Sequence, residues 1–266
     1  MAILTYIGIK YAAGNFTGVD DVLTVEELLS IAINGKPYTI TMRTPGSDDE
    51  LVRGLLFTEG VYTDRNENPL IQIIAKDILG YTTAVNVLVD ENKIMKDFAG
   101  KRNVISVSSC GICGKTELDD LSAAKSLDKE KKLSPEKVEG MFNQMSERQK
   151  TFQQSGGSHA SAAFTTEGEM LAMEEDIGRH NAVDKVIGSL LMQSTLSKAS
   201  CILVSGRVSY EIVSKAYCAG IPFLAAVSAP SSLAVDYSKE LGITLMAFCR
   251  NGKLTVYSNN SQVILN

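Results

Sequence analysis

Hydrophobic and polar positions in the second half of the chain alternate between amphipathic segments and short apolar runs. The paired segments and runs span 181–193 then 201–205, 209–219 then 223–227, and 232–241 then 244–250. Buried strands that alternate with helices are typical of right-handed βαβ units, in which helices cover both faces of a sheet with parallel strand pairs. The pattern therefore predicts an α/β domain from residue 103 to the C-terminus.

Two further elements are predicted just upstream of this alternation. Ser134-Pro135-Glu136 marks the start of a helix, because Pro is tolerated at the first helical position. The apolar stripe of that helix comprises Val138, Met141, Phe142, Met145 and Phe152. Apolar runs at 160–164 and 170–173 flank Glu167-Gly168 and predict a hairpin, while the charged stretch 119–132 is interpreted as a solvated connector.

The first hundred residues have a different pattern. Runs at 30–33 and 38–42 are joined through Asn34-Gly35, a strong hairpin signal. Ser47 and Glu50 have the spacing of a capping box, and the helix predicted after them ends near Gly60. Further strands are predicted at 71–75 and 84–89. We therefore predict a small α+β N-terminal domain over residues 1–102 and the α/β domain over 103–266.

Composition narrows the class of protein. The chain has 266 residues, of which 44% are hydrophobic and 21% charged, as in ordinary globular proteins. It has no apolar run near the ~20 residues of a membrane span and no signal-like basic start, so we expect a cytosolic protein without a membrane partner. The net charge of −5 argues against duplex nucleic acid as a partner.

The most distinctive local motif is Cys110-Gly111-Ile112-Cys113-Gly114, which follows a predicted strand at 104–107. Glycines within and after a pair of thiols let backbone N–H groups approach sulfur, which favours the nucleophilic thiolate. The chain has five cysteines, so they cannot all pair within it. The motif is compatible with a sulfur carrier, a dithiol oxidoreductase, a zinc site or two inert cysteines.

The sequence lacks residues that a structural zinc site, a thioredoxin-like oxidoreductase or a zinc deaminase would need. A structural zinc site needs a second close pair of ligands, and His159, His180, Cys201, Cys218 and Cys249 contain none; we therefore expect no bound metal. A thioredoxin-like motif would have a neighbouring Trp, and the chain has no Trp. The zinc deaminase signature places H-x-E before P-C-x-x-C, whereas here the cysteine pair comes first and His159 lacks that Glu.

Several other clusters of polar residues and glycines fall at predicted strand ends or helix starts. They are residues 156–159, 174–181, 205–207, 228–232 and 248–253. Free N–H groups and the positive end of a helix favour anions at such places, and Arg adds bidentate pairing with phosphate. The sequence thus predicts a site for a phosphorylated ligand without naming it. Cys201 and Cys218 are expected to be buried in the core.

Taken in order, these clusters resemble the formate dehydrogenase accessory sulfurtransferase family, FdhD. The resemblance spans nearly the whole chain and is carried by residues 41–46, 55–60, 109–115, 156–160, 176–186, 204–207 and 225–232. It implies a cytidine-deaminase-like α/β fold with an added N-terminal domain, and a cytoplasmic homodimer. It further implies that a cysteine desulfurase loads sulfur, which is delivered to the molybdenum cofactor, bis(molybdopterin guanine dinucleotide), before that cofactor enters formate dehydrogenase.

The resemblance also implies roles for particular residues. Cys110 matches the persulfide-bearing cysteine and Cys113 its partner. The segment Phe248, Cys249, Arg250, Asn251, Gly252 and Lys253 matches the stretch assigned to the guanine dinucleotide cofactor. Arg250 and Lys253 would face phosphates there, and Phe248 would either stack on a base or end the core of its strand. The sequence leaves open whether the cofactor is contacted by His159, Arg179, His180 and Arg207. The alternative functions are a chaperone of the molybdenum cofactor without sulfur chemistry and a C-x-x-C dithiol oxidoreductase.

Overall fold

The computed structural model describes residues 2–94 and 127–264 of the protein. The described helices are α1 (Asp48–Thr58), α2 (Pro135–Arg148), α3 (Lys150–Ser155), α4 (Arg179–Met192), α5 (Tyr210–Ala219) and α6 (Ser232–Leu241). The N-terminal strands are β1 (Ile3–Ala12), β2 (Asn15–Thr24), β3 (Glu27–Ile33), β4 (Lys36–Arg43), β5 (Leu70–Lys76) and β6 (Thr82–Leu88). The later strands are β7 (His159–Phe164), β8 (Met170–Asp176), β9 (Cys201–Val204), β10 (Phe223–Ala226), β11 (Thr244–Arg250) and β12 (Lys253–Val256).

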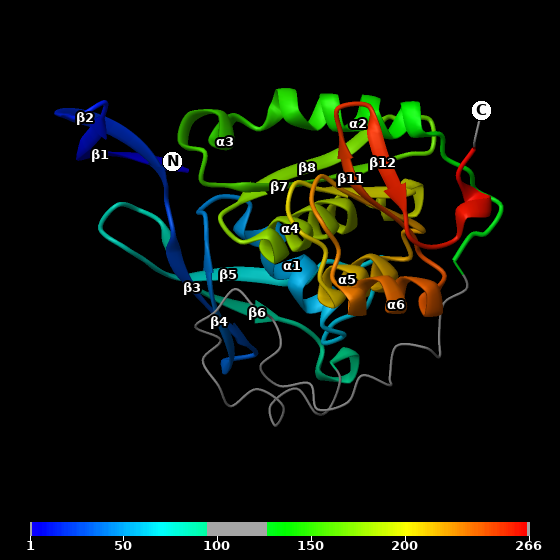
Figure 1. The fold of residues 1–266 in the computed structure, drawn as a ribbon. Helices are drawn as coiled ribbons and strands as arrows, with labels where there is room; N and C mark the ends of the chain where they lie inside the picture. The colour runs from blue at the N-terminus through cyan, green and yellow to red at the C-terminus, as the bar shows by residue number, and fades with distance from the viewer. Residues whose placement is uncertain (1, 95–126, 265–266) are drawn as a thin grey trace.

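The later strands form one six-stranded sheet in the order β12-β11-β10-β9-β7-β8. β9, β10 and β11 are parallel neighbours, and antiparallel strands flank them on both sides. Helix α2 packs on one face of this sheet, and α4, α5 and α6 pack on the other (Figure 1). The predicted α/β class and the predicted alternation of strands and helices are therefore confirmed.

Side chains on the central strands alternate between the two cores. On β9, Ile202 and Val204 face the core beneath α4 and α5, while Cys201 and Leu203 face the core beneath α2. Because both faces are buried, the strand is apolar at every position instead of every second one. This burial explains the continuous apolar runs in the sequence.

The N-terminal region forms a four-stranded sheet in the order β4-β3-β6-β5, with α1 packed against it. Asn34 and Gly35 both have positive φ at the turn between β3 and β4, as a tight hairpin requires. The predicted hairpin is confirmed. The predicted boundary between domains at residues 102 and 103, like the predicted strand at 104–107, lies outside the described residues.

Two local predictions about helices were wrong. Ser47 is the N-cap residue of α1 as its position predicts, but its side chain does not form the predicted capping box: its backbone is left-handed, and its hydroxyl donates a hydrogen bond to Glu174 Oε2 of β8 at 2.8 Å. Phe152 does not belong to the apolar stripe of α2, since that helix ends at Arg148 and a separate helix, α3, leaves Phe152 46% exposed. Both differences come from tertiary contacts and chain direction that local spacing does not encode.

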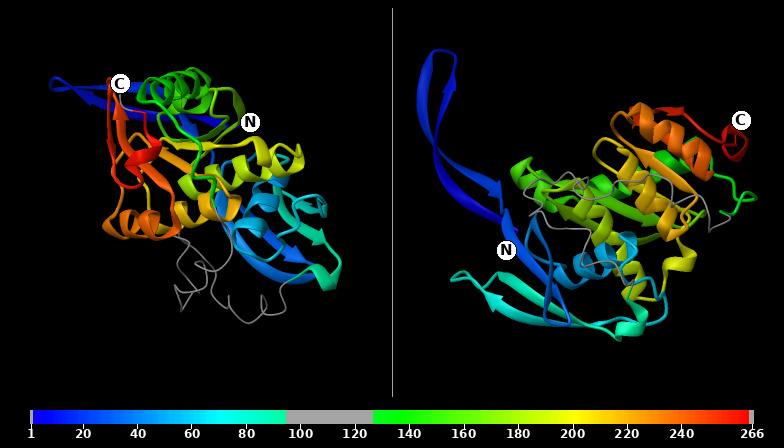
Figure 2. Two further views of the ribbon diagram at one scale, coloured as in Figure 1. Left: turned by 90° about the vertical axis from the view of Figure 1, so that its right-hand side faces the viewer. Right: turned by 90° about the horizontal axis from the view of Figure 1, so that it is seen from below.

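The strands β1 and β2 form a separate two-stranded hairpin that projects from the body of the molecule (Figures 1 and 2). The sequence analysis did not predict it. One face of this arm carries exposed apolar side chains, among them Ile7 at 89% and Ile9 at 78% exposure. An isolated two-stranded hairpin is at best marginally stable in water. The exposed apolar face of the arm is therefore expected to be buried against another protein surface.

Candidate functional site

The candidate site lies at the edge of the six-stranded sheet where its parallel strands end. The loop after β9 is joined to the loop after β10, because Val208 N donates to Ala229 O at 3.1 Å and Ser231 N donates to Val208 O at 2.9 Å. Phe248 N in turn donates to Ser228 O at 3.3 Å. The predicted clusters at 205–207, 228–232 and 248–253 therefore form one continuous edge, at the place where ligands bind in open α/β sheets.

The segment predicted to bind a cofactor is the turn between β11 and β12. Arg250 pairs with Lys253, and Asn251 and Gly252 both have positive φ between them. A tight two-residue turn of this kind presents its flanking side chains to solvent, and both Arg250 and Lys253 are exposed. The structure thus places the two predicted phosphate contacts side by side.

Phe248 forms an irregularity in β11. Its backbone is left-handed, with φ at 55°, and the register with β12 shifts between Ala247 and Arg250. Its side chain is 37% exposed, so it is not the last core residue of the strand. The same bulge turns Cys249 into the core beneath α2, where burial raises the pKa of its thiol to about 11. Cys249 therefore packs in the core as a neutral thiol, and it also lines the pocket described next.

The turn forms one wall of a pocket of about 140 Å³. The opposite wall is the first half of α2, including Glu136 and Glu139. Pockets that enclose a drug-sized ligand usually span ~300–1,000 Å³. This pocket can therefore hold one portion of a dinucleotide, with Arg250 and Lys253 at its rim.

A buried ion pair fixes the segment that precedes α4. Asp176 Oδ2 lies 2.8 Å from Lys185 Nζ, and both side chains are fully buried. Asp176 also accepts hydrogen bonds from the backbone N–H groups of Thr44 and Gly178 and from Asn181 Nδ2. Burying both charges is tolerated because every one of these contacts compensates lost hydration. The contacts of Asp176 thus fix the position of the first turn of α4.

A second buried network joins three helices. Lys215 Nζ of α5 lies 2.8 Å from Asp184 Oδ2 of α4, and the hydroxyl of Thr58 at the end of α1 donates to Asp184 Oδ1 at 2.8 Å. The sequence analysis singled out the segments 55–60 and 176–186 and predicted the helix at 209–219, but it did not indicate that they meet in this network. Together with the Asp176 cluster, the network ties residues from the N-terminal region directly to the helix that borders the site.

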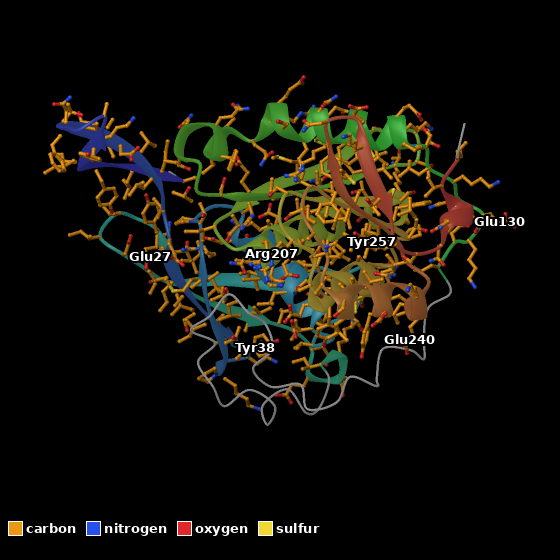
Figure 3. All side chains as sticks on the ribbon, in the orientation of Figure 1. Glu27, Tyr38, Glu130, Arg207, Glu240 and Tyr257 are labelled. Atoms are coloured by element: carbon orange, nitrogen blue, oxygen red, sulfur yellow. The ribbon has the colours of Figure 1, made fainter. Side chains whose placement is uncertain are left out.

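Two histidines lie near this sheet edge, His180 of motif 176–186 and His159 at the start of β7. His180 Nε2 lies 3.1 Å from both Ser209 Oγ and Glu211 Oε2, and the hydrogen bond to His180 lowers the pKa of Glu211. His159 begins β7 opposite Asp176, and burial, reinforced by Arg179, lowers the pKa of its imidazole. In the view of Figure 3, Arg207 lies between Glu27 of β3 and Tyr257 beyond β12.

The predicted nucleophiles Cys110 and Cys113 lie outside the described residues. Of the other cysteines, Cys201 is buried as expected, with its thiol pKa raised by burial, whereas Cys218 is only partly buried, contrary to expectation. In residues 2–94 and 127–264, no group of three or more His, Cys, Asp or Glu side chains is arranged to hold a metal ion. No helix in this part of the chain has the length and apolar character that a membrane crossing requires.

Comparison with known proteins gives consistent matches over most of the chain. The chain is 42% identical over 253 residues to the "Sulfur carrier protein FdhD" of Streptomyces avermitilis, covering 92% of this chain and 90% of that one. The proteins of the same name from Mycobacterium tuberculosis and Sulfurisphaera tokodaii are 42% and 39% identical, and each match covers more than nine-tenths of both chains.

The fold also has a solved counterpart. A crystal structure of a candidate formate dehydrogenase accessory protein from Desulfotalea psychrophila matches with a TM-score of 0.77, covering 99% of this chain and 100% of that one. At 22% sequence identity this match supports the fold. Residues 24–264 match the FdhD/NarQ family as a whole. The sequence resemblance, the relatives and the fold therefore agree, and the chain belongs to the FdhD/NarQ family.

Proposed function

We propose that the protein is a sulfur carrier and sulfurtransferase that serves formate dehydrogenase. The observation that carries the proposal is the 42% identity to a protein named as a sulfur carrier over nine-tenths of both chains. The pair Cys110 and Cys113, set among glycines, supplies the thiol chemistry that this function needs. Its partners would be a cysteine desulfurase and formate dehydrogenase, in the cytoplasm, where thiols stay reduced.

Loading is a thiol exchange at sulfur. The thiolate of Cys110 attacks the outer sulfur of a persulfide on the desulfurase, which forms a new S–S bond on Cys110 and releases the desulfurase thiolate. Electrons balance within this exchange, because one S–S bond replaces another. The product is a persulfide on Cys110.

Delivery needs two electrons to convert the outer sulfur of that persulfide into hydrosulfide. Cys113 is the candidate source: its thiolate attacks the inner sulfur, forms a Cys110–Cys113 disulfide and releases hydrosulfide to the substrate. A Cys113→Ser variant would then load sulfur normally but deliver it slowly. This assigns the two thiols different steps of one reaction.

The substrate in this proposal is the molybdenum cofactor in its bis(molybdopterin guanine dinucleotide) form. Support comes from the β11–β12 turn, where Arg250 and Lys253 stand exposed side by side and Phe248 offers an exposed ring that could stack on a base. Because the pocket of about 140 Å³ holds only a portion of such a ligand, the rest would extend along the sheet edge.

We further propose that the protein is a homodimer and that a second copy covers the β1–β2 arm. Ile7, Ile9, Tyr11 and Phe16 make one face of the arm apolar, and the rings of Tyr11 and Phe16 lie 5.0 Å apart. The same chain exposes a second apolar surface on β5 and its following turn, with Ile73, Ile74, Ile78 and Leu79 exposed. Two copies can cover these surfaces reciprocally, as a two-fold interface requires.

Labelling by a cysteine desulfurase tests the proposed function against its rivals. A sulfur carrier incubated with a desulfurase and cysteine gains one sulfur atom on the peptide that contains Cys110. A cofactor chaperone without sulfur chemistry would leave that peptide unmodified while binding a guanine nucleotide. A dithiol oxidoreductase would instead reduce protein disulfides and depend equally on Cys110 and Cys113.

A further inference from the structure

Three basic side chains gather at the sheet edge where β9 ends and β7 begins. A Cβ atom on Gly206 would lie 3.2 Å from His159 Nδ1 and 3.5 Å from Arg179 Cδ, so the loop after β9 lies directly against both side chains. Arg207, the next residue of this loop, acts electrostatically on His159 and belongs to the same group. His159, Arg179 and Arg207 are called the basic cluster below.

One donor of the basic cluster has no acceptor among the described residues. Arg179 Nε is buried and has no hydrogen-bond partner. Two carboxylates act electrostatically on the cluster, and both have hydrogen-bonded partners outside it. Asp176 pairs with Lys185 at 2.8 Å, and Glu211 accepts hydrogen bonds from Ser209 at 2.7 Å and from His180 at 3.1 Å. A buried N–H donor without a partner costs free energy, which a ligand atom could recover.

Two helices begin beside the basic cluster. Helix α4 starts at Arg179, and its N-cap residue Gly178 has no side chain to satisfy the free N–H groups. Helix α5 starts after Ser209, whose hydroxyl bonds Glu211 Oε2 and does not cap the backbone. Free N–H groups at a helix start, with the positive end of the helix dipole, add to the attraction for an anion.

We propose that the basic cluster is a binding site for the phosphoryl group of a phosphate ester or diphosphate. Arg179 and Arg207 would supply planar pairs of donors, which match the geometry of phosphate oxygens, and His159 would add one further donor. Gly206 lets the loop after β9 approach His159 and Arg179 closely because it lacks a Cβ. This site is separate in residues from the turn at 250–253 and requires no sulfur chemistry.

His159 provides a direct reporter of the site. Burial lowers its pKa, and the positive charges of Arg179, His180 and Arg207 lower it further, whereas Asp176 acts in the opposite direction. A bound phosphoryl dianion would offset those positive charges and raise the pKa of His159. The chain contains only two histidines, so its imidazole signals in a proton NMR spectrum are assigned by comparison with a His180→Gln variant.

The test is a pH titration of the histidine signals of the full chain, alone and with inorganic pyrophosphate or GDP, at constant ionic strength. The proposal predicts a rise of the His159 pKa by at least half a unit with a bound probe. In Arg207→Gln, at an exposed position, about tenfold more probe should be needed for the half-maximal rise of the His159 pKa. Arg179→Gln should show the same change, provided that its thermal unfolding matches that of the wild type. Lys239→Gln, which removes an equal charge in the last turn of α6, should leave the effect intact.

The two probes distinguish the source of the phosphoryl group. A rise with pyrophosphate supports recognition of the phosphoryl group alone, and a rise with GDP only supports a site that needs the attached nucleoside. An unchanged His159 pKa with both probes, or an equal rise in Arg207→Gln and wild type, would overturn the proposal. No desulfurase or sulfur donor is present, so the result is independent of whether Cys110 carries sulfur.

Discussion

Gly54 of α1 and Gly188 of α4 lie backbone against backbone where the two helices cross. A Cβ on Gly54 would lie 1.9 Å from Asp184 O, and a Cβ on Gly188 would lie 1.8 Å from Glu50 O. No side chain fits at either position. This contact joins the four-stranded N-terminal sheet to the six-stranded sheet through their covering helices, and it sets the position of the helix whose first turn borders the candidate site.

Alanine at either glycine is therefore expected to destabilise the protein. Gly54→Ala or Gly188→Ala forces the helices apart, at a cost of about 1–3 kcal/mol or more in the free energy of unfolding. Urea unfolding followed by circular dichroism measures the change. Gly140→Ala in α2 is the control, because a Cβ there meets nothing within 4 Å and alanine favours the helix by about 0.5–1 kcal/mol. Equal stability of the variants Gly54→Ala and Gly140→Ala would refute the account of this crossing.

The β11–β12 turn is expected to bind the nucleotide part of the cofactor. Replacing Arg250 or Lys253 with Gln removes a charge that faces the proposed phosphates, and each change should weaken GDP binding about tenfold, or about 1.4 kcal/mol. Isothermal titration calorimetry measures the affinity. Arg148→Gln, at the far end of α2, removes the same charge away from the pocket and should not alter it. Unchanged GDP affinity in both turn variants would exclude the turn as a binding element.

Cys249 lies within the proposed cofactor segment, yet its thiol is expected to be unreactive. With a pKa of about 11, about one thiol in a thousand is ionised at pH 8, and the side chain is buried. Brief iodoacetamide treatment of the native protein, followed by peptide mass spectrometry, should leave Cys249 and Cys201 unlabelled, and labelling should appear after denaturation. Rapid native labelling of Cys249 would show that the β11 bulge does not bury it.

The apolar face of the β1–β2 arm is expected to hold the dimer together. Ile7→Asp combined with Ile9→Asp places two charges on this face and should convert the dimer to monomer in sedimentation velocity experiments. Lys10→Asp alters the opposite face of the same strand and should leave the dimer intact, because successive strand residues point to opposite faces. A dimer that survives the double substitution would show that a different surface forms the interface.

The alternation of apolar runs and amphipathic segments predicted β9, β10 and β11 with their helices, since burial on both faces leaves a continuous apolar signal. The edge strand β12 was not predicted. Local pattern failed where tertiary contacts decide the outcome. Ser47 has the spacing of a capping box, but its hydroxyl donates a hydrogen bond to Glu174 of a distant strand. The β1–β2 arm was not predicted, and its apolar side chains are exposed instead of packed in a core. Glycines within helices gave no sign of the Gly54 and Gly188 contact, because a close crossing depends on both partners at once.

For the candidate site, the sequence named the clusters but not their geometry. Arg250 and Lys253 were predicted to face phosphates, and the β11–β12 turn pairs the two residues in its register. By contrast, motif 176–186 contains both structural and candidate ligand-binding residues. Asp176 forms a buried ion pair, whereas Arg179 has a buried N–H donor without a hydrogen-bond partner. Sequence spacing cannot separate the two, because the separation depends on Thr44 and Gly206 from distant segments.

The most direct test of the central claim is the mass of the Cys110 peptide after incubation with a cysteine desulfurase and cysteine. The account predicts one added sulfur atom in wild type and in Cys249→Ala, whose thiol is buried, and none at this peptide in Cys110→Ala. It also predicts that Cys113→Ser gains the sulfur at the wild-type rate. A wild-type Cys110 peptide without added sulfur, or sulfur that accumulates instead on Cys249, would contradict the assignment of the protein as a sulfur carrier through Cys110.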